Sequence, residues 1–148
     1  MSTTQTITIE AVPGTEIRIR LVPPATSLNI STVDGMLGEL VRRGGGRIRE
    51  AADGLIQMGY VPDVPDVRKG GQRQAYLGWS DPARAYDARA KFTLYLEPGT
   101  VSFGLATDRR VVSGLPGADT TPESYVAFRL TQPDGVAHAL AAARAVKR

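Results

Sequence analysis

Two neighbouring stretches of the chain carry apolar residues at helical spacing. Each follows the i, i+3, i+4, i+7, i+8 pattern that places side chains on one face of an α-helix. The first contains Val33, Met36, Leu37, Leu40 and Val41, and the second contains Ile48, Ala51, Ala52, Leu55 and Ile56. Ser31, followed three residues later by Asp34, predicts the start of the first helix. Three glycines at residues 44–46 end it, and Gly59 suits a left-handed cap after the second helix. We therefore predict an αα-hairpin over residues 31–60.

Alternating apolar and polar residues predict short strands elsewhere in the chain. The stretches are residues 6–12, 16–21, 74–79, 92–96, 101–105 and 124–130. Pro-Gly pairs at residues 13–14 and 98–99 suit type II turns, so we expect the first two strands to form one hairpin and residues 92–105 another. Pro62 and Pro65 exclude residues 61–67 from a central strand and predict an extended connector.

The last third of the chain combines a polar stretch with an alanine-rich one. Residues 107–123 are rich in Gly, Pro, Asp, Ser and Thr and predict a loop, with residues 110–113 as a short edge strand. Pro133 suits the first turn of a final helix, which ends in Arg144, Lys147 and Arg148, cations suited to a helix C-terminus. The order of elements predicts an α+β fold: an antiparallel or mixed sheet built from hairpins, packed by the αα-hairpin and a C-terminal helix.

Composition predicts one domain spanning residues 1–148. Hydrophobic residues make up 42% of the chain and charged residues 22%, which is typical of globular domains. The chain has no cysteine, which excludes disulfides and thiolate nucleophiles. We find no run of roughly 18 apolar residues and no signal-peptide pattern, so we expect a cytoplasmic protein without a membrane partner.

Positive charge gathers around the glycines of the αα-hairpin. Arg42, Arg43, Arg47 and Arg49 flank them, although the net charge of the whole chain is only +3. Backbone amides of Gly45 and Gly46, at the positive end of the second helix, are suited to binding a phosphate. The stretch lacks the Lys-Ser/Thr ending of a phosphate-binding loop, so we expect no nucleotide cofactor. The alternative is a plain interhelical turn with solvated arginines.

A second basic group lies further along the chain, in a predicted hairpin tip. It contains Arg68, Lys69 and Arg73. The two helices followed by this hairpin resemble a winged helix-turn-helix over residues 31–79. The resemblance implies that residues 47–58 form a recognition helix and residues 68–73 a wing that holds phosphates. Glu50 and Asp53 on the same helix would face phosphates, which counts against a recognition helix that reads bases. Contact of the arginines with the nucleic-acid backbone and plain structural linkage are the two interpretations that remain.

Aromatic and basic residues alternate in the middle of the chain. They are Arg73, Tyr76, Trp79, Arg84, Tyr86, Arg89, Lys91 and Tyr95. One interpretation is a stacking surface for single-stranded nucleic acid. The other is that the aromatic residues lie at the rim of the core with their polar tips in water.

Catalytic residues are hard to find in this sequence. His138 is the only histidine and has no acid three or four residues on, so neither a local catalytic triad nor a two-histidine metal site is supported. Asp63, Asp66, Asp81 and Asp87, together with Lys91, are the right residue types for a magnesium-dependent nuclease, but their spacing is generic. We therefore expect a protein that is not an enzyme and holds no metal or cofactor.

These observations predict a non-catalytic binding domain that contacts an anionic partner, with the nucleic-acid backbone as the first choice. The contacts would come from the basic glycine turn and the basic hairpin. The alternative is a small structural or adaptor subunit that acts through a protein partner or a homo-oligomer. A metal-dependent nuclease is a remote third possibility.

Overall fold

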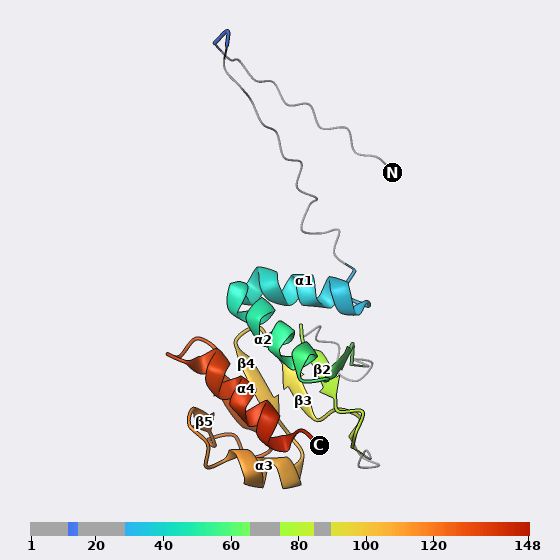
Figure 1. Ribbon diagram of the computed structural model, residues 1–148, viewed down its shortest axis with the longest axis vertical. Coiled ribbons are helices and arrows are strands. Elements are labelled where there is room, and N and C mark those ends of the chain that lie inside the picture. The colour runs from blue at the N-terminus through green and yellow to red at the C-terminus, as the bar shows by residue number, and fades with distance from the viewer. Residues whose placement is uncertain (1–11, 15–28, 66–74, 85–89) are drawn as a thin grey trace.

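The computed structural model describes residues 12–14, 29–65, 75–84 and 90–148. In this part of the chain, four helices and six strands form an α+β fold with an antiparallel sheet, as the sequence predicts (Figure 1). The elements are α1 (Val33–Gly44), α2 (Gly46–Gln57), β1 (Val61–Asp63), β2 (Leu77–Ser80), β3 (Leu94–Leu96), β4 (Thr100–Phe103), α3 (Ala106–Val112), β5 (Ala118–Asp119), β6 (Val126–Arg129) and α4 (Gly135–Val146). No helix among the described residues is long and apolar enough to cross a membrane.

The six strands lie in the order β1-β2-β3-β4-β6-β5, and every described pair is antiparallel. The Pro-Gly turn at residues 98–99 joins β3 to β4, with the Glu97 amide donating to the Thr100 carbonyl at 2.8 Å. This hairpin is confirmed. In the predicted N-terminal hairpin, Gly14 has a φ of +91°, which suits its expected turn, while both strands fall outside the described residues.

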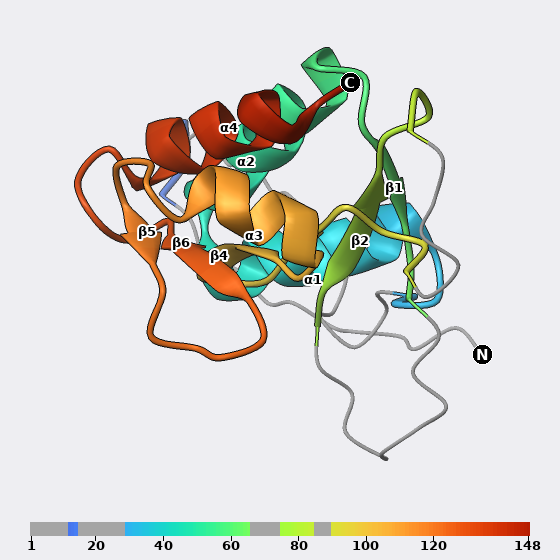
Figure 2. The ribbon, with the colours of Figure 1, turned by 90° about the horizontal axis from the view of Figure 1, so that it is seen from below.

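One apolar core lies between the sheet and the helices. Figure 1 shows α2 and α4 in front of the sheet, and Figure 2 shows the same helices stacked above it. Leu94 and Leu96 of β3 are fully buried in this core, together with Trp79 of β2. The alanines of α4 let it approach α2 closely, and Leu140 of α4 packs over Gly54. Burial of this shared apolar surface is the main force that holds the layers together.

Both ends of the αα-hairpin are capped by hydrogen bonds. Thr32, one residue later than the predicted Ser31, is the N-cap of α1, and its Oγ1 accepts from the Gly35 amide at 3.1 Å. At the end of α2, Gly59 has a φ of +92°, and its amide donates to the Ile56 carbonyl at 3.0 Å. The Tyr60 amide donates to the Leu55 carbonyl at 3.1 Å, which completes a Schellman motif. The predicted glycine cap is confirmed.

One member of the predicted apolar stripe is not buried. Ile56 is 51% exposed, whereas the other four members of the α2 stripe are buried. At 3.6 residues per turn, Ile56 lies about 80° around the helix from Ile48. It therefore falls on the flank of α2, beyond the reach of the core.

The prediction of a loop over residues 107–123 is wrong for residues 107–112 and 118–119, and the rest of the range is loop as predicted. Ala106–Val112 form α3, and the expected edge strand at residues 110–113 is largely part of this helix. The Arg109 amide donates to the Leu105 carbonyl at 2.9 Å, and Val112 is fully buried in the core. Burial of Val112 stabilises a helix too short to show a clear apolar period. The strand in this region is β5, six residues after the helix.

Two proline-containing boundaries also differ from expectation. Residues 61–63 are extended, as predicted, but they also pair with β2 as an edge strand, where Pro62 needs no ladder donor on its outer side. Pro133 does not lie in the first turn of the last helix, because Asp134, with a φ of 58°, is the N-cap and α4 begins at Gly135.

Candidate functional site

The turn between α1 and α2 is tighter than three consecutive glycines suggest. Gly44 ends α1, Gly46 begins α2, and only Gly45 lies between the two helices. The Gly45 amide donates to the Val41 carbonyl at 2.7 Å, which closes the last turn of α1. Gly44 lies so close to the β3–β4 turn that an added Cβ would be 2.1 Å from the Pro98 carbonyl oxygen. The turn is therefore held against one end of the sheet.

The first turn of α2 has the features of an anion-binding helix N-terminus. Its N-cap, Gly45, has no side chain with which to cap the helix. The Ile48 amide donates to the Gly45 carbonyl at 3.2 Å, whereas the amides of Gly46 and Arg47 form no hydrogen bond with another described residue. Such amides, at the positive end of the helix dipole, attract an anionic oxygen.

Arg42 and Arg43, both predicted to bind an anion, are held by an acid that the sequence reading overlooked. Arg42 donates to both carboxylate oxygens of Glu39, at 2.9 and 2.5 Å, and Arg43 Nε donates to Oε1 at 2.8 Å. The hydrogen bonds from Arg42 and then Arg43 lower the pKa of Glu39 to about 2. The three- and four-residue spacing from Glu39 was the available sequence signal.

Arg47 and Arg49 are exposed on α2, and neither forms an ion pair with another described residue. The structure thus brings all four predicted arginines close to one turn. Four acids lie on the same helix pair, namely Asp34, Glu39, Glu50 and Asp53. The four arginines and four acids leave the two helices together with no net charge, whereas residues 39–53 around the turn, with four positive and three negative charges, have a net charge of +1.

The second basic group falls outside the described residues. Arg68, Lys69 and Arg73 belong to it, so its convergence with the glycine turn stays a prediction. The predicted recognition helix corresponds to α2, and it packs against α4. Gly54 packs against Leu140 of α4 closely enough that an added Cβ would lie 2.6 Å from Leu140 Cδ1. One flank of α2 is therefore covered.

The predicted aromatic and basic surface is not formed as a whole. Trp79 is fully buried, so the core interpretation is right for it, and Arg84 is paired with Asp108. Tyr86 and Arg89 lie outside the described residues. Tyr76 and Tyr95 do come together, with ring centroids 5.8 Å apart in an edge-to-face arrangement.

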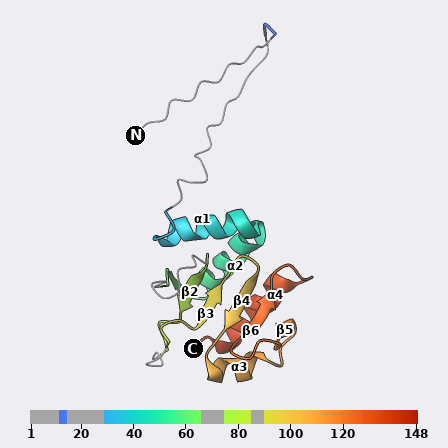
Figure 3. The same cartoon turned by 180° about the vertical axis from the view of Figure 1, so that it is seen from behind.

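This tyrosine pair lies on the face of the sheet opposite the helices, which Figure 3 shows from behind. Leu94 and Leu96 face the core, so Tyr95 between them faces the other way, beside its register partner Ser102. Phe92 also contacts Tyr95, at 5.7 Å between centroids, and its ring covers Gly78, where an added Cβ would be 2.5 Å from Cγ. Glycine at residue 78 thus makes room for Phe92 in the aromatic row, which consists of Tyr76, Tyr95 and Phe92.

A cavity of about 270 Å³ opens on this face. It is lined by Tyr76, Tyr95, Glu97, Ser102, Gly104 and Tyr125. Tyr125 is 41% exposed, and the Glu97 carboxylate is oriented by the Thr100 hydroxyl, which donates to it at 2.9 Å. Sequence reasoning missed Tyr125, Glu97 and Ser102 as members of a site, because only the strand register brings them together.

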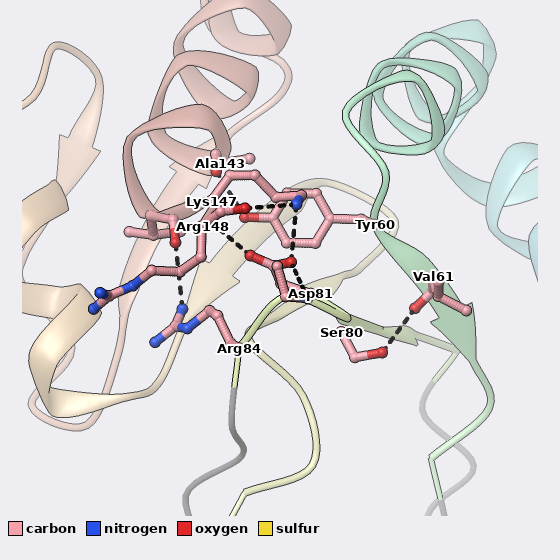
Figure 4. Close-up of polar contacts among 10 residues, drawn as sticks. Tyr60, Val61, Ser80, Asp81, Arg84, Ala143, Lys147 and Arg148 are labelled. Carbon is pink, nitrogen blue, oxygen red and sulfur yellow. Dashed lines mark hydrogen bonds and ion pairs between the residues drawn. The ribbon is translucent and has the colours of Figure 1, made fainter.

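A buried polar network joins the end of β2 to the end of α4 (Figure 4). Asp81 is fully buried and accepts from the Arg148 amide at 2.7 Å, from the Ala83 amide at 2.9 Å and from Lys147 Nζ at 2.9 Å. The Tyr60 hydroxyl donates to the Ala143 carbonyl at 2.7 Å. Asp81 and Tyr60 are thus each engaged with the C-terminal end of the chain.

Neither Tyr60 nor Asp81 is suited to act as a general base. Burial and the nearby Asp81 carboxylate raise the pKa of the Tyr60 hydroxyl well above its ordinary value. Burial alone would raise the pKa of Asp81, but the hydrogen bonds from the Arg148 amide and Lys147 outweigh it and lower that pKa. Tyr60 therefore stays protonated and Asp81 stays charged at neutral pH, which suits a structural role.

The two described carboxylates among those considered for metal binding, Asp63 and Asp81, are each paired with a lysine. Asp63 pairs with Lys91, Asp81 pairs with Lys147, and Asp66 and Asp87 fall outside the described residues. Nowhere in the described part of the chain do three or more histidine or acidic side chains form a cluster able to hold a metal ion. His138 is half-buried on α4 against Gly117.

Comparisons with known proteins add no relative. No protein-family model, no curated protein and no solved structure matches this chain.

Proposed function

We propose that this protein is a non-catalytic binding domain that contacts the phosphate backbone of a nucleic acid at the turn between α1 and α2. One observation carries the proposal. Arg42, Arg43, Arg47 and Arg49 are all exposed around a glycine N-cap that leaves the first amides of α2 available. Arginine and helix amides are the groups that most often bind phosphate oxygens.

The role of Glu39 makes the proposal specific. Its carboxylate neutralises part of the charge of Arg42 and Arg43 and points their guanidinium groups back toward α1. A bound phosphate competes with Glu39 for these two arginines. Arg47 and Arg49 face no such competition from a described residue, so we expect them to contribute more to binding.

The proposal is tested by titrating the full chain with random single-stranded and duplex oligonucleotides at several salt concentrations. Arg43→Ala combined with Arg47→Ala should weaken binding and lower the salt slope by roughly 0.7 to 0.9 for each lost contact. The matched control is Arg110→Ala with Arg144→Ala, which removes two exposed arginines from α3 and α4. Absence of binding at low salt, or an equal loss in the control, would refute the proposal.

Glu39→Gln gives an opposite and independent result. It removes the competing charge while keeping the side-chain size, so oligonucleotide affinity and salt slope should both rise. A lower affinity in this variant would mean that Glu39 positions the arginines for binding and does not compete with the phosphate. A stability measurement on the same variant separates binding from folding.

The second candidate is an adaptor subunit that binds another protein, and the cavity on the face of the sheet opposite the helices favours it. The sheet edges give it little support, because β1 has three residues with a proline and β5 has two. In contrast, the face of the sheet opposite the helices carries three tyrosines around the cavity. This candidate predicts a stable complex or oligomer by light scattering, and a strictly monomeric protein with no co-purifying partner would count against it.

A further inference from the structure

The cavity on the face of the sheet opposite the helices is lined mainly by aromatic and acidic side chains among the described residues. Three of its six described lining residues are tyrosines, Tyr76, Tyr95 and Tyr125, and Glu97 is the only charged residue among the six. None of these six described residues is a lysine, arginine or histidine. The described lining therefore carries one negative charge, in a chain whose net charge is +3. Aromatic ring faces and a carboxylate attract the same class of ligand, an organic cation.

The ring of Tyr95 is held in place by its strand and by neighbouring aromatic rings. Tyr95 lies on β3, opposite Ser102 of β4, and its ring contacts Tyr76 and Phe92 edge to face. Burial, with a smaller contribution from Tyr76, raises the pKa of Tyr95, so its hydroxyl stays neutral at physiological pH. Thr100 fixes the Glu97 carboxylate through the hydrogen bond at 2.9 Å. The site is therefore largely formed before any ligand arrives.

The same face already holds a cation over an aromatic ring. Lys91 Nζ lies 5.2 Å from the centroid of Phe92, next to Tyr95 in the aromatic row. Lys91 is also paired with Asp63, so a ring and a carboxylate share this ammonium group. The cavity offers the same combination without a cation of its own among the described residues.

We propose that this cavity binds the guanidinium or ammonium group of a basic side chain from a partner protein, with the ring faces of Tyr95 and Tyr125 against the cation and Glu97 as its counter-charge. A volume of about 270 Å³ is smaller than a typical drug-sized pocket, and it suits one side chain. The open, strand-lined surroundings leave room for the peptide backbone that carries this side chain. The proposal deepens the adaptor candidate and is independent of the proposed nucleic-acid contact.

The probe is a short peptide, acetyl-Gly-Arg-Gly-amide, titrated into the full chain and followed by NMR shifts of the cavity residues. A peptide with citrulline in place of arginine keeps the shape and removes the charge. We expect the arginine peptide to bind and the citrulline peptide to bind at least about threefold more weakly. Equal binding of the two peptides would overturn the proposal.

Variants of Tyr125 and Glu97 distinguish the contributions of the aromatic ring, the phenol hydroxyl and the carboxylate charge to peptide binding. Tyr125→Leu and Glu97→Gln should each weaken arginine-peptide binding by about two- to fivefold, the range expected for one exposed cation–π contact or ion pair. Tyr125→Phe keeps the ring and should bind as the native chain does. Unchanged binding in Tyr125→Leu, with thermal unfolding also unchanged, would contradict the assignment.

Two further titrations distinguish other occupants. If tetramethylammonium binds at the cavity but the arginine peptide does not, the ligand is a free small cation and a protein partner is excluded. If an oligonucleotide loses affinity in Tyr125→Leu, the cavity stacks a base and the cation proposal is wrong. Failure of the Arg43 and Arg47 variants to alter oligonucleotide binding refutes only the proposed nucleic-acid function, because those residues do not line the cavity.

Discussion

Gly45 is the single residue that separates two 12-residue helices. Its backbone angles, a φ of +77° and a ψ of −162°, lie in a region that is open almost only to glycine. Gly46, the next residue, begins α2 in open space, with no atom within 4 Å of an added Cβ and no positive φ. Two adjacent glycines therefore have different physical reasons to be present.

Alanine substitution separates these reasons. Gly45→Ala should lower the free energy of unfolding by about 1 to 3 kcal/mol, because the backbone angles become strained. Gly46→Ala should leave it unchanged or raise it by up to about 1 kcal/mol, because alanine is the better helix former. Urea denaturation of both variants measures the difference. Equal effects would mean that the turn relaxes to other angles.

At this scale the sequence predicted the grouping of the four arginines better than that of the cavity residues. Arg42, Arg43, Arg47 and Arg49 are nearly consecutive, so a helix turn keeps them close whatever the tertiary structure. Tyr76, Tyr95 and Tyr125 come from three separate segments, and their meeting depends on strand order and register. The alternation of apolar and polar residues within one strand predicts neither the strand order nor the register.

Among the elements, α1 gains stability at its last turn from the three hydrogen bonds that Arg42 and Arg43 donate to Glu39. A carboxylate whose pKa is lowered on folding stabilises the native state above its unfolded pKa and loses that contribution as the pH falls through the folded pKa. For Glu39 the range runs from the ordinary value of 4.5 down to about 2.

This range gives a pH prediction. The free energy of unfolding of the native chain should fall between pH 4.5 and 2 more steeply than that of Glu39→Gln, which has no carboxylate to titrate at this position. NMR titration of the native chain should place the Glu39 midpoint near 2. A midpoint near 4.5 would show that Arg42 and Arg43 are not held by Glu39 in solution.

The elements that the sequence predicted are those with long or regular apolar patterns. Both helices of the αα-hairpin, the β3–β4 hairpin and α4 show several periods each. In contrast, α3 has only seven residues, which is less than two full turns of helix. Its apolar residues therefore repeat too few times to show a helical period, and Val112 is the one that is fully buried. The sequence did not predict that β1 pairs with β2. A strand that contains proline is tolerated at the edge of a sheet, and the sequence pattern of one segment does not tell where that segment lies in the sheet.

At the scale of the whole molecule, a buried ion pair connects the segment after β2 to α3. Arg84 donates to both oxygens of Asp108, at 2.8 and 3.0 Å, and the two side chains are only 13% and 6% exposed. Arg84 also reaches the Val146 carbonyl at 3.5 Å, near the end of α4. Three distant parts of the chain thus meet at one guanidinium group.

Removal of one partner should be costly because it leaves a buried charge unpaired. Asp108→Ala is expected to lower the free energy of unfolding by about 3 kcal/mol or more. Arg129→Ala breaks the exposed pair with Asp119 and should cost less than about 1 kcal/mol. Chemical denaturation of both variants compares the two, and a similar small loss in each would show that water reaches Arg84.

The strand order has a consequence for the time course of folding. In the described sheet, β1 to β4 pair in the order in which they occur along the chain, so each new strand finds its neighbour already in place. Only β6 must reach back past α3 and β5 to pair with β4. Local pairings of this kind close within microseconds, whereas distant ones wait for a longer loop to close. We therefore expect the pairing of β6 with β4 to be the last step in completing the described sheet.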